Sequence, residues 1–333
     1  MKIWNIPIES LEERYSKSWN EYFPVAFEEA DVEFETIYPE PLSDKIRDGS
    51  FLDICGTNYF KALQLVTLSK KLYDGEIKAG DIIFVQDLWF PGLEGLAYIR
   101  QGLNLDFKIC GILHAGTYDP HDFLTKCGMK SWGRHLEVCW FDFVDKIFVA
   151  TNFHKELIYQ NRRVDYEKIV VTGLPIYSNQ CHDMSKKENI VVFPHRLDSE
   201  KQPEMFDLLS KEAATDGWQF IKSKEVCKNK KEYFELLNRS KIAVSFAQQE
   251  TWGIAQQEAL FANCFPVVPS RLSYEEMYSN VFKYSSFADA LLLVKKLMEP
   301  DYSDLERLRQ NKNFLLLKGI KAIPNMIKEM RNL

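Results

Sequence analysis

Two glutamates in the second half of the chain have seven residues between them. Glu250 lies in a short loop after an apolar run, and Glu258 lies on a helix predicted to begin at Gly253. One carboxylate therefore precedes the helix and the other projects from it, so both can reach one ligand from different directions. The N–H groups of Gly253 and Ile254 at the helix start suit a phosphate. A carboxylate beside a phosphate is costly unless it accepts hydroxyl protons, and sugar hydroxyls meet that need.

A charged turn follows the strand predicted over Asn189–Phe193. It carries Arg196 and Lys201. Two fixed cations opposite a helix N-terminus can balance phosphate charge, the arginine as a two-pronged donor and the lysine as a point charge. The alternative interpretation is a solvated turn with a surface ion pair from Arg196 to Asp198 or Glu200.

A histidine ends the strand predicted over Phe107–His114, and His121 and Asp122 follow after a turn. A histidine in that place can donate a hydrogen bond to a hydroxyl or polarise a reacting group. The alternative is a structural histidine that closes the strand. A metal site is not expected, because no further ligands cluster with these three residues.

The segment Lys241–Val268 resembles the E-x7-E signature of retaining glycosyltransferases with the GT-B fold, particularly the GT4-like group. The matching stretches are Glu250-Thr-Trp-Gly253, Glu258-Ala-Leu-Phe-Ala262 and Cys264-Phe-Pro-Val267. The resemblance implies that Glu258 binds the ribose of a donor nucleotide and that Glu250 contacts the transferred sugar. The implied catalytic residues are His114, Arg196, Lys201 and Glu250. The implied donor-binding residues are Arg196, Lys201, Glu250, Thr251, Trp252, Gly253, Ile254 and Glu258.

The chain departs from the pattern of these enzymes in two places. Pro194-His195 stands where glycine is usual, and the stretch Pro7–Ser16 contains no glycine where the related enzymes have a glycine-rich loop. Aromatic and cationic residues near predicted strand ends are therefore the candidates for acceptor binding. They are Arg14, Tyr15, Trp89 and Tyr118. For Arg14 and Tyr15, a helix face packed on a sheet is the alternative.

Short runs rich in Ile, Val and Phe alternate with segments of helical periodicity, which predicts buried parallel strands covered by helices. We expect two Rossmann-like α/β domains facing a central cleft, at 1–177 and 189–310, joined by a polar linker at 178–188, and the resemblance implies that they are of the GT-B type. A C-terminal helix at 311–333 is expected to pack back toward the first domain. The helical pattern over Leu305–Met330 is predicted to break near Pro324.

Composition narrows the class of protein. Of 333 residues, 46% are hydrophobic and 27% charged, which excludes disordered, coiled-coil and collagen-like chains. Seven cysteines without a CxxC pair indicate neither a disulfide framework nor a zinc ribbon. No signal sequence and no apolar run of about 18 residues is recognised, so a soluble cytoplasmic protein without membrane insertion is expected, in bacteria or a phage-infected cell. A net charge of −6 excludes a strongly basic surface overall.

The resemblance implies a metal-independent, retaining hexosyl- or pentosyltransferase with no cofactor beyond a UDP-linked sugar as co-substrate. The acceptor is expected to be a saccharide or a hydroxymethylated base in DNA, since EERYSKSW resembles phage-encoded glycosyltransferases. Basic stretches that could contact DNA are Lys70-Lys71, Arg162-Arg163 and Lys222–Lys231. The alternatives are a sugar-nucleotide epimerase and a catalytically silent binding or scaffold protein. The sequence predicts no particular protein partner.

Overall fold

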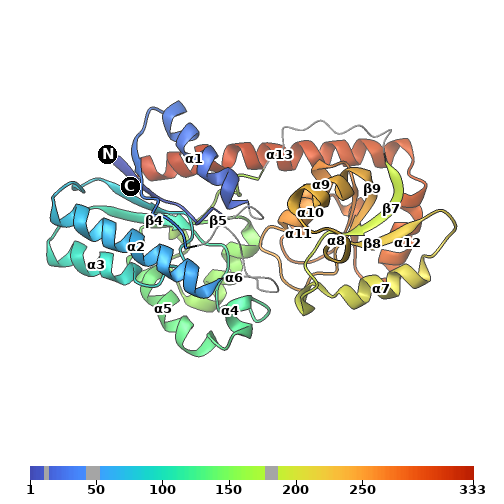
Figure 1. The fold of residues 1–333 in the computed structure, drawn as a ribbon, viewed down its shortest axis with the longest axis horizontal. Coiled ribbons are helices and arrows are strands. Elements are labelled where there is room, and N and C mark those ends of the chain that lie inside the picture. Colours follow the sequence, from blue (N-terminus) through green and yellow to red (C-terminus); the bar gives the residue numbers. More distant parts are fainter. Residues whose placement is uncertain (11–14, 43–52, 177–186) are drawn as a thin grey trace. The chain divides into compact units, whose positions relative to one another are not determined.

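The computed structural model describes residues 1–10, 15–42, 53–176 and 187–333 (Figure 1). The chain divides into two compact units. The first comprises Met1–Ala150, His154–Pro175 and Lys321–Leu333, and the second comprises Thr151–Phe153 and Ile176–Ile320. Arg14 and most of the linker predicted at 178–188 lie outside the described residues.

The first unit is built on a six-stranded parallel sheet with the order β2-β1-β3-β4-β5-β6. Its strands are β1 Lys2–Ile6, β2 Glu33–Thr36, β3 Ile82–Val85, β4 Lys108–Ile112, β5 Lys146–Val149 and β6 Ile169–Val171. Each except β2 lies within a run that the sequence predicts to be a strand, and β2 overlaps the run predicted over Phe34–Tyr38 but begins one residue earlier. Its helices are α1 Ser16–Glu29, α2 Ile54–Tyr73, α3 Leu93–Gly102, α4 Phe123–Lys126, α5 Lys130–Phe143 and α6 Asn152–Arg162.

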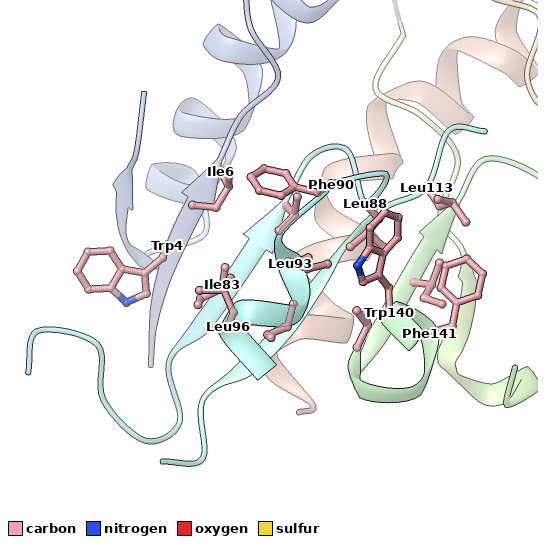
Figure 2. Packing of buried hydrophobic residues seen from close by; sticks show 14 of the residues in the cluster. Trp4, Ile6, Ile83, Leu88, Phe90, Leu93, Leu96, Leu113, Trp140 and Phe141 are labelled. Carbon is pink, nitrogen blue, oxygen red and sulfur yellow. The ribbon is translucent and has the colours of Figure 1, made fainter. Parts of the chain in front are cut away.

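Large apolar side chains fill the space between this sheet and α2, α3 and α5. Figure 2 shows Trp4 and Ile83 on the sheet, Leu93 from α3, and Trp140 from α5, and all four are less than 2% exposed. Burying side chains of this size contributes about 1.5–3 kcal/mol each. This core fixes the strand ends from which the candidate site residues of the first unit project.

The second unit is built on a five-stranded parallel sheet with the order β11-β10-β9-β7-β8. Its strands are β7 Glu188–Phe193, β8 Gln219–Lys222, β9 Ser240–Val244, β10 Phe265–Pro269 and β11 Lys283–Tyr284. Its helices include α7 Pro203–Glu212, α8 Ser223–Val226, α9 Lys230–Arg239, α10 Ile254–Phe261, α11 Tyr274–Met277 and α12 Phe287–Met298. Because β7 and β9 pair directly, the loops that follow them lie at the same edge of the sheet.

The last helix, α13 Tyr302–Arg331, is continuous through Pro324, so the predicted break there is wrong. Its final third, from Lys321, belongs to the first unit. Proline removes one backbone hydrogen bond of a helix. Pro324 is exposed, whereas Ile323, Met326 and Met330 around it are buried. The packing of these neighbours compensates for the lost bond. The sequence predicts a break because it shows the proline but not this packing.

Candidate active site

In the second unit, the loops after β7 and β9 are joined by a lysine–glutamate pair. Lys201 Nζ lies 2.8 Å from Glu250 Oε1 and donates to the carbonyl oxygen of Gln249 at 2.6 Å. Both side chains are largely buried, with 7% of Lys201 and 14% of Glu250 exposed. The backbone N–H of Gln248 also donates to the carbonyl of Glu200. Two charged residues that the sequence singles out separately are thus in direct contact.

Arg196 lies on the same turn as Lys201 but is more accessible, with 36% of its side chain exposed. It pairs with Asp198 through Nη1, and its Nη2 lies 3.3 Å from Glu200 Oε1. These are the ion pairs of the solvated-turn alternative. Two carboxylates of the loop that follows β7 therefore hold the guanidinium of Arg196.

The start of α10 is shaped by Gly253. This residue has φ of +83°, and a Cβ added to it would lie 2.7 Å from Tyr274 Cε1, so glycine is required for both conformation and space. No side chain caps the helix, and its first turn contains no acidic residue. The first-turn N–H groups, including that of Ile254, give this end of α10 a partial positive charge.

Two residues of the predicted donor site serve other purposes as the structure stands. Trp252 is only 1% exposed, and its Nε1 donates to Gln257 Oε1, so its side chain belongs to the core. The carbonyl oxygen of Thr251 accepts from Thr151 Oγ1 at 2.9 Å. Both residues fix the path of the loop that carries Glu250 toward α10.

Glu258 is held by two residues of α9 that the sequence analysis did not identify. Lys230 Nζ lies 2.9 Å from one carboxylate oxygen and Tyr233 OH lies 3.0 Å from the other. Burial, followed by the charge of Glu258, raises the pKa of Tyr233 well above its usual value, so the phenol remains a donor. Lys230 is in the basic run Lys222–Lys231. The spacing of residues along the chain gives no sign that this run contacts Glu258, so the contact could not be predicted from the sequence.

His195 is buried beside Glu250, with its Nδ1 3.7 Å from Glu250 Oε1. Burial first, and then the charges of Lys201 and Arg196, lower the pKa of this imidazole well below its usual value. His195 is therefore neutral at neutral pH. The histidine that replaces the usual glycine thus packs inward, against Phe193, and adds no charge to the site.

In the first unit, His114 lies just beyond the carboxyl end of β4. Its Nε2 is 2.8 Å from the carbonyl oxygen of Gln86, and because a carbonyl only accepts, Nε2 carries the proton. Its Nδ1 lies 3.4 Å from Tyr15 OH. Tyr15 also packs against Trp19, at 4.8 Å between ring centroids. The structure thus brings together two of the predicted residues, a histidine and an aromatic acceptor candidate.

The other two acceptor candidates of the first unit differ in accessibility. Trp89 is half-buried, and its Nε1 donates to Glu137 Oε1 at 3.2 Å. Tyr118 is 5% exposed, and its OH lies 2.6 Å from Nε2 of the buried His154. A substrate cannot stack on Tyr118 as it is placed. Its ring is a core side chain, a distinction that depends on packing and not on local sequence.

Asp122 caps α4 by accepting from the N–H of Leu124, and burial raises its pKa to about 6. The folded protein therefore retains the Asp122 proton between about pH 3.8 and 6, where the unfolded chain loses it. Stability from this group is present below pH 3.8 and is lost as the pH rises through 6. We expect Asp122→Asn to gain stability relative to the native protein by about 3 kcal/mol between pH 4 and 6.5. Chemical unfolding at a series of pH values measures this, and parallel curves for the two proteins would contradict it.

The described residues contain no group of three or more His, Cys, Asp or Glu side chains arranged to hold a metal ion. In the part of the chain that the structure describes, no helix combines the length and apolarity needed to cross a bilayer.

Comparison with known proteins concerns the fold and part of the sequence. No family model matches the sequence. The sucrose-phosphate synthase of Thermosynechococcus elongatus has a similar structure, with a TM-score of 0.67 and 10% identity, covering 99% of this chain and 100% of that one. TarM of S. aureus, solved in complex with UDP, has a TM-score of 0.57 and 14% identity, covering 82% of this chain and 58% of TarM.

In sequence, the chain is similar to the tRNA-queuosine alpha-mannosyltransferase of Drosophila melanogaster, with 24% identity over 159 residues. The match covers 40% of this chain and 41% of the fly protein. The chain thus spans less than half of that relative. Two parallel sheets flanked by helices, together with these structural neighbours, show that the chain has the α/β fold of the GT-B glycosyltransferases.

Proposed function

We propose that this chain is a retaining glycosyltransferase that moves a hexosyl or pentosyl group from a nucleotide-linked sugar to an acceptor hydroxyl without a metal ion. The observation that carries the proposal is the contact between Lys201 and Glu250. It joins a phosphate-binding cation to a sugar-binding carboxylate at the carboxyl edge of the second sheet. Ligands of open parallel sheets bind at this edge.

The donor diphosphate binds Lys201, Arg196 and the start of α10. Lys201 and Arg196 are already positioned by carboxylate partners, so a diphosphate replaces existing ion pairs and does not have to order two mobile side chains. The partial positive charge at the start of α10 supports the same anion.

The ribose of the donor binds Glu258. Its two oxygens contact Lys230 and Tyr233, and each carboxylate oxygen has capacity for a further hydrogen bond. Lys230 and Tyr233 therefore orient Glu258 toward the ribose hydroxyls, and Glu250 remains for the transferred sugar.

In the reaction, the bond between the anomeric carbon and the diphosphate oxygen breaks, and the acceptor oxygen bonds to the same face of the sugar. The acceptor proton leaves with the departing diphosphate. Negative charge builds on that diphosphate, and Lys201, Arg196 and the α10 N-terminus stabilise it. No protein nucleophile is required, and the configuration at the anomeric carbon is retained.

We propose a UDP-linked donor, which is supported by the complex of the structurally similar TarM with UDP. The acceptor is a saccharide or a base in a nucleic acid. The similar fly protein is a tRNA-queuosine alpha-mannosyltransferase, which supports a base in RNA as an acceptor in addition to a hydroxymethylated base in DNA.

Calorimetric titration of the purified chain with a panel of nucleotide-sugars tests the proposal. We expect one of them to bind with a dissociation constant between about 1 μM and 1 mM, the usual range for enzyme substrates. Mass spectrometry then identifies products with saccharides, hydroxymethylated DNA and tRNA as acceptors. A scaffold protein would bind none of the panel, and an epimerase would convert the donor without any acceptor.

A further inference from the structure

The start of α5 in the first unit carries a cluster of cationic and aromatic side chains. Residues 123–136 contain no Asp or Glu, although the chain as a whole has a net charge of −6. Five residues of α4 and α5 define what we call the α5 surface. They are Lys126, Lys130, Trp132, Arg134 and His135. In Figure 1, α4 lies beside α5.

Two cations of this surface, on α5, are accessible to a ligand. Lys130 and Arg134 are exposed, and among the described residues neither makes an ion pair. Several cations of the basic stretches that the sequence picks out are paired instead. Arg162 is buried on Glu137, and Lys222 pairs with Asp207 and Glu225. Lys70 and Lys71 are also paired, with Asp74, Glu35 and Glu76. What distinguishes α5 is that its exposed cations Lys130 and Arg134 flank the exposed ring of Trp132.

Trp132 is 49% exposed but rests on a rigid support. Its ring packs against Trp89, with 6.2 Å between centroids and a 66° interplanar angle. Trp89 packs in turn on the buried Trp140 and donates to the buried Glu137. An indole held in this way presents a fixed apolar face to solvent, which is the property of a stacking platform.

The α5 surface begins at the carboxyl edge of the sheet, the edge at which open parallel sheets bind their ligands. The strand β4 ends at Ile112, and the chain then passes His114 and Tyr118 before α4 and the first turn of α5. The first turn of α5 therefore lies at the carboxyl edge of the sheet, on the same side as His114.

We propose that the α5 surface binds a single-stranded segment of nucleic acid. Its phosphates contact Lys130 and Arg134, and an unstacked base lies on Trp132. Cations beside an exposed aromatic ring are the features that single strands need, because the bases of a duplex are already stacked. A membrane surface is less suited, since the apolar side chains Trp140 and Phe141 of α5 are buried in the core. The inference rests on the proposed function in one respect only, that the bound nucleic acid is the acceptor.

Fluorescence anisotropy with a labelled RNA oligonucleotide of about 12 nucleotides tests binding directly. We expect Lys130→Glu/Arg134→Glu to weaken binding more than tenfold and to reduce the slope of log affinity against log salt by about 1.4. Trp132→Ala should weaken binding about tenfold, and Trp132→Phe should restore most of it. The control is Lys78→Glu/Lys328→Glu, which changes the net charge equally at two other exposed positions of the first unit and should leave binding unchanged.

Three outcomes would overturn the inference. They are no RNA binding in about 50 mM salt, equal losses in the α5 and control variants, and binding of phosphatidylserine vesicles but not of RNA. A single-stranded DNA of the same sequence shows whether the sugar matters to binding. Nucleotide-sugar binding, measured on the same variants, should be unchanged. RNA binding without any donor binding would refute the glycosyltransferase and leave the α5 surface intact.

Discussion

Replacing Glu258 with alanine is expected to lower the rate of sugar transfer about 100-fold or more without unfolding the protein. In the function that we propose, Glu258 presents an oriented carboxylate to the donor ribose, and its loss removes a charged hydrogen-bond acceptor. The side chain is 15% exposed at the edge of α10, and Lys230, its ion-pair partner, can turn to solvent. The folded structure should therefore survive. Arg196→Ala is expected to have a similar effect on transfer, through the departing diphosphate.

The matched control for this experiment is Glu235→Ala. Glu235 lies on α9 near Lys230 but is exposed and makes only a 4.0 Å ion pair with Lys231. Transfer by this variant should equal that of the native enzyme. Single-turnover rates with saturating donor, together with thermal unfolding curves, separate lost catalysis from lost folding. Near-native turnover by a folded Glu258→Ala protein would refute the assigned role.

The local part of the site could be predicted from sequence because its residues lie close together along the chain. Glu250, Gly253 and Glu258 fall within nine residues, so the strand, loop and helix that carry them fix their relation. The parallel sheets are predictable for a similar reason, since each buried strand is a continuous apolar run.

The partners of these residues could not be predicted in the same way. Lys230 and Tyr233 are 28 and 25 residues from Glu258 along the chain and reach it only because α9 packs beside α10. In sequence, Lys230 is one lysine in a basic run. Only its position relative to the carboxylate distinguishes it from its neighbours.

The sequence also did not show which aromatic side chains are buried and which are exposed. Tyr118, Trp252 and Trp132 all lie near strand or helix ends, yet the first two are buried and the third is half exposed. Which ring faces solvent depends on what packs over it. For Tyr118, that is His154 and the guanidinium of Arg162, 5.5 Å from its ring.

Replacing Arg162 with methionine is expected to lower the free energy of unfolding by about 3–5 kcal/mol. Arg162 Nε lies 2.7 Å from Glu137 Oε2, and only 5% and 1% of the two side chains are exposed. Methionine fills a similar volume but leaves the carboxylate buried without a compensating charge. Thr117, which donates to Glu137 through its backbone N–H and its hydroxyl, cannot replace a cation.

Two further variants identify the cause of that loss. Arg162→Met/Glu137→Gln removes the stranded charge and keeps an oxygen for Thr117 and Trp89, so more than half of the lost stability should return. Arg239→Met breaks an exposed pair with Glu188, with 54% and 49% of the side chains exposed, and should cost less than about 1 kcal/mol. Denaturant unfolding monitored by tryptophan fluorescence measures all three, since five of the seven tryptophans lie in the first unit and Trp218 and Trp252 lie in the second, with Arg239. If Arg162→Met lowered the free energy of unfolding no more than Arg239→Met, the buried pair of Arg162 and Glu137 would not stabilise the first unit. Glu137 would then not be the residue that fixes Trp89, on which Trp132 packs.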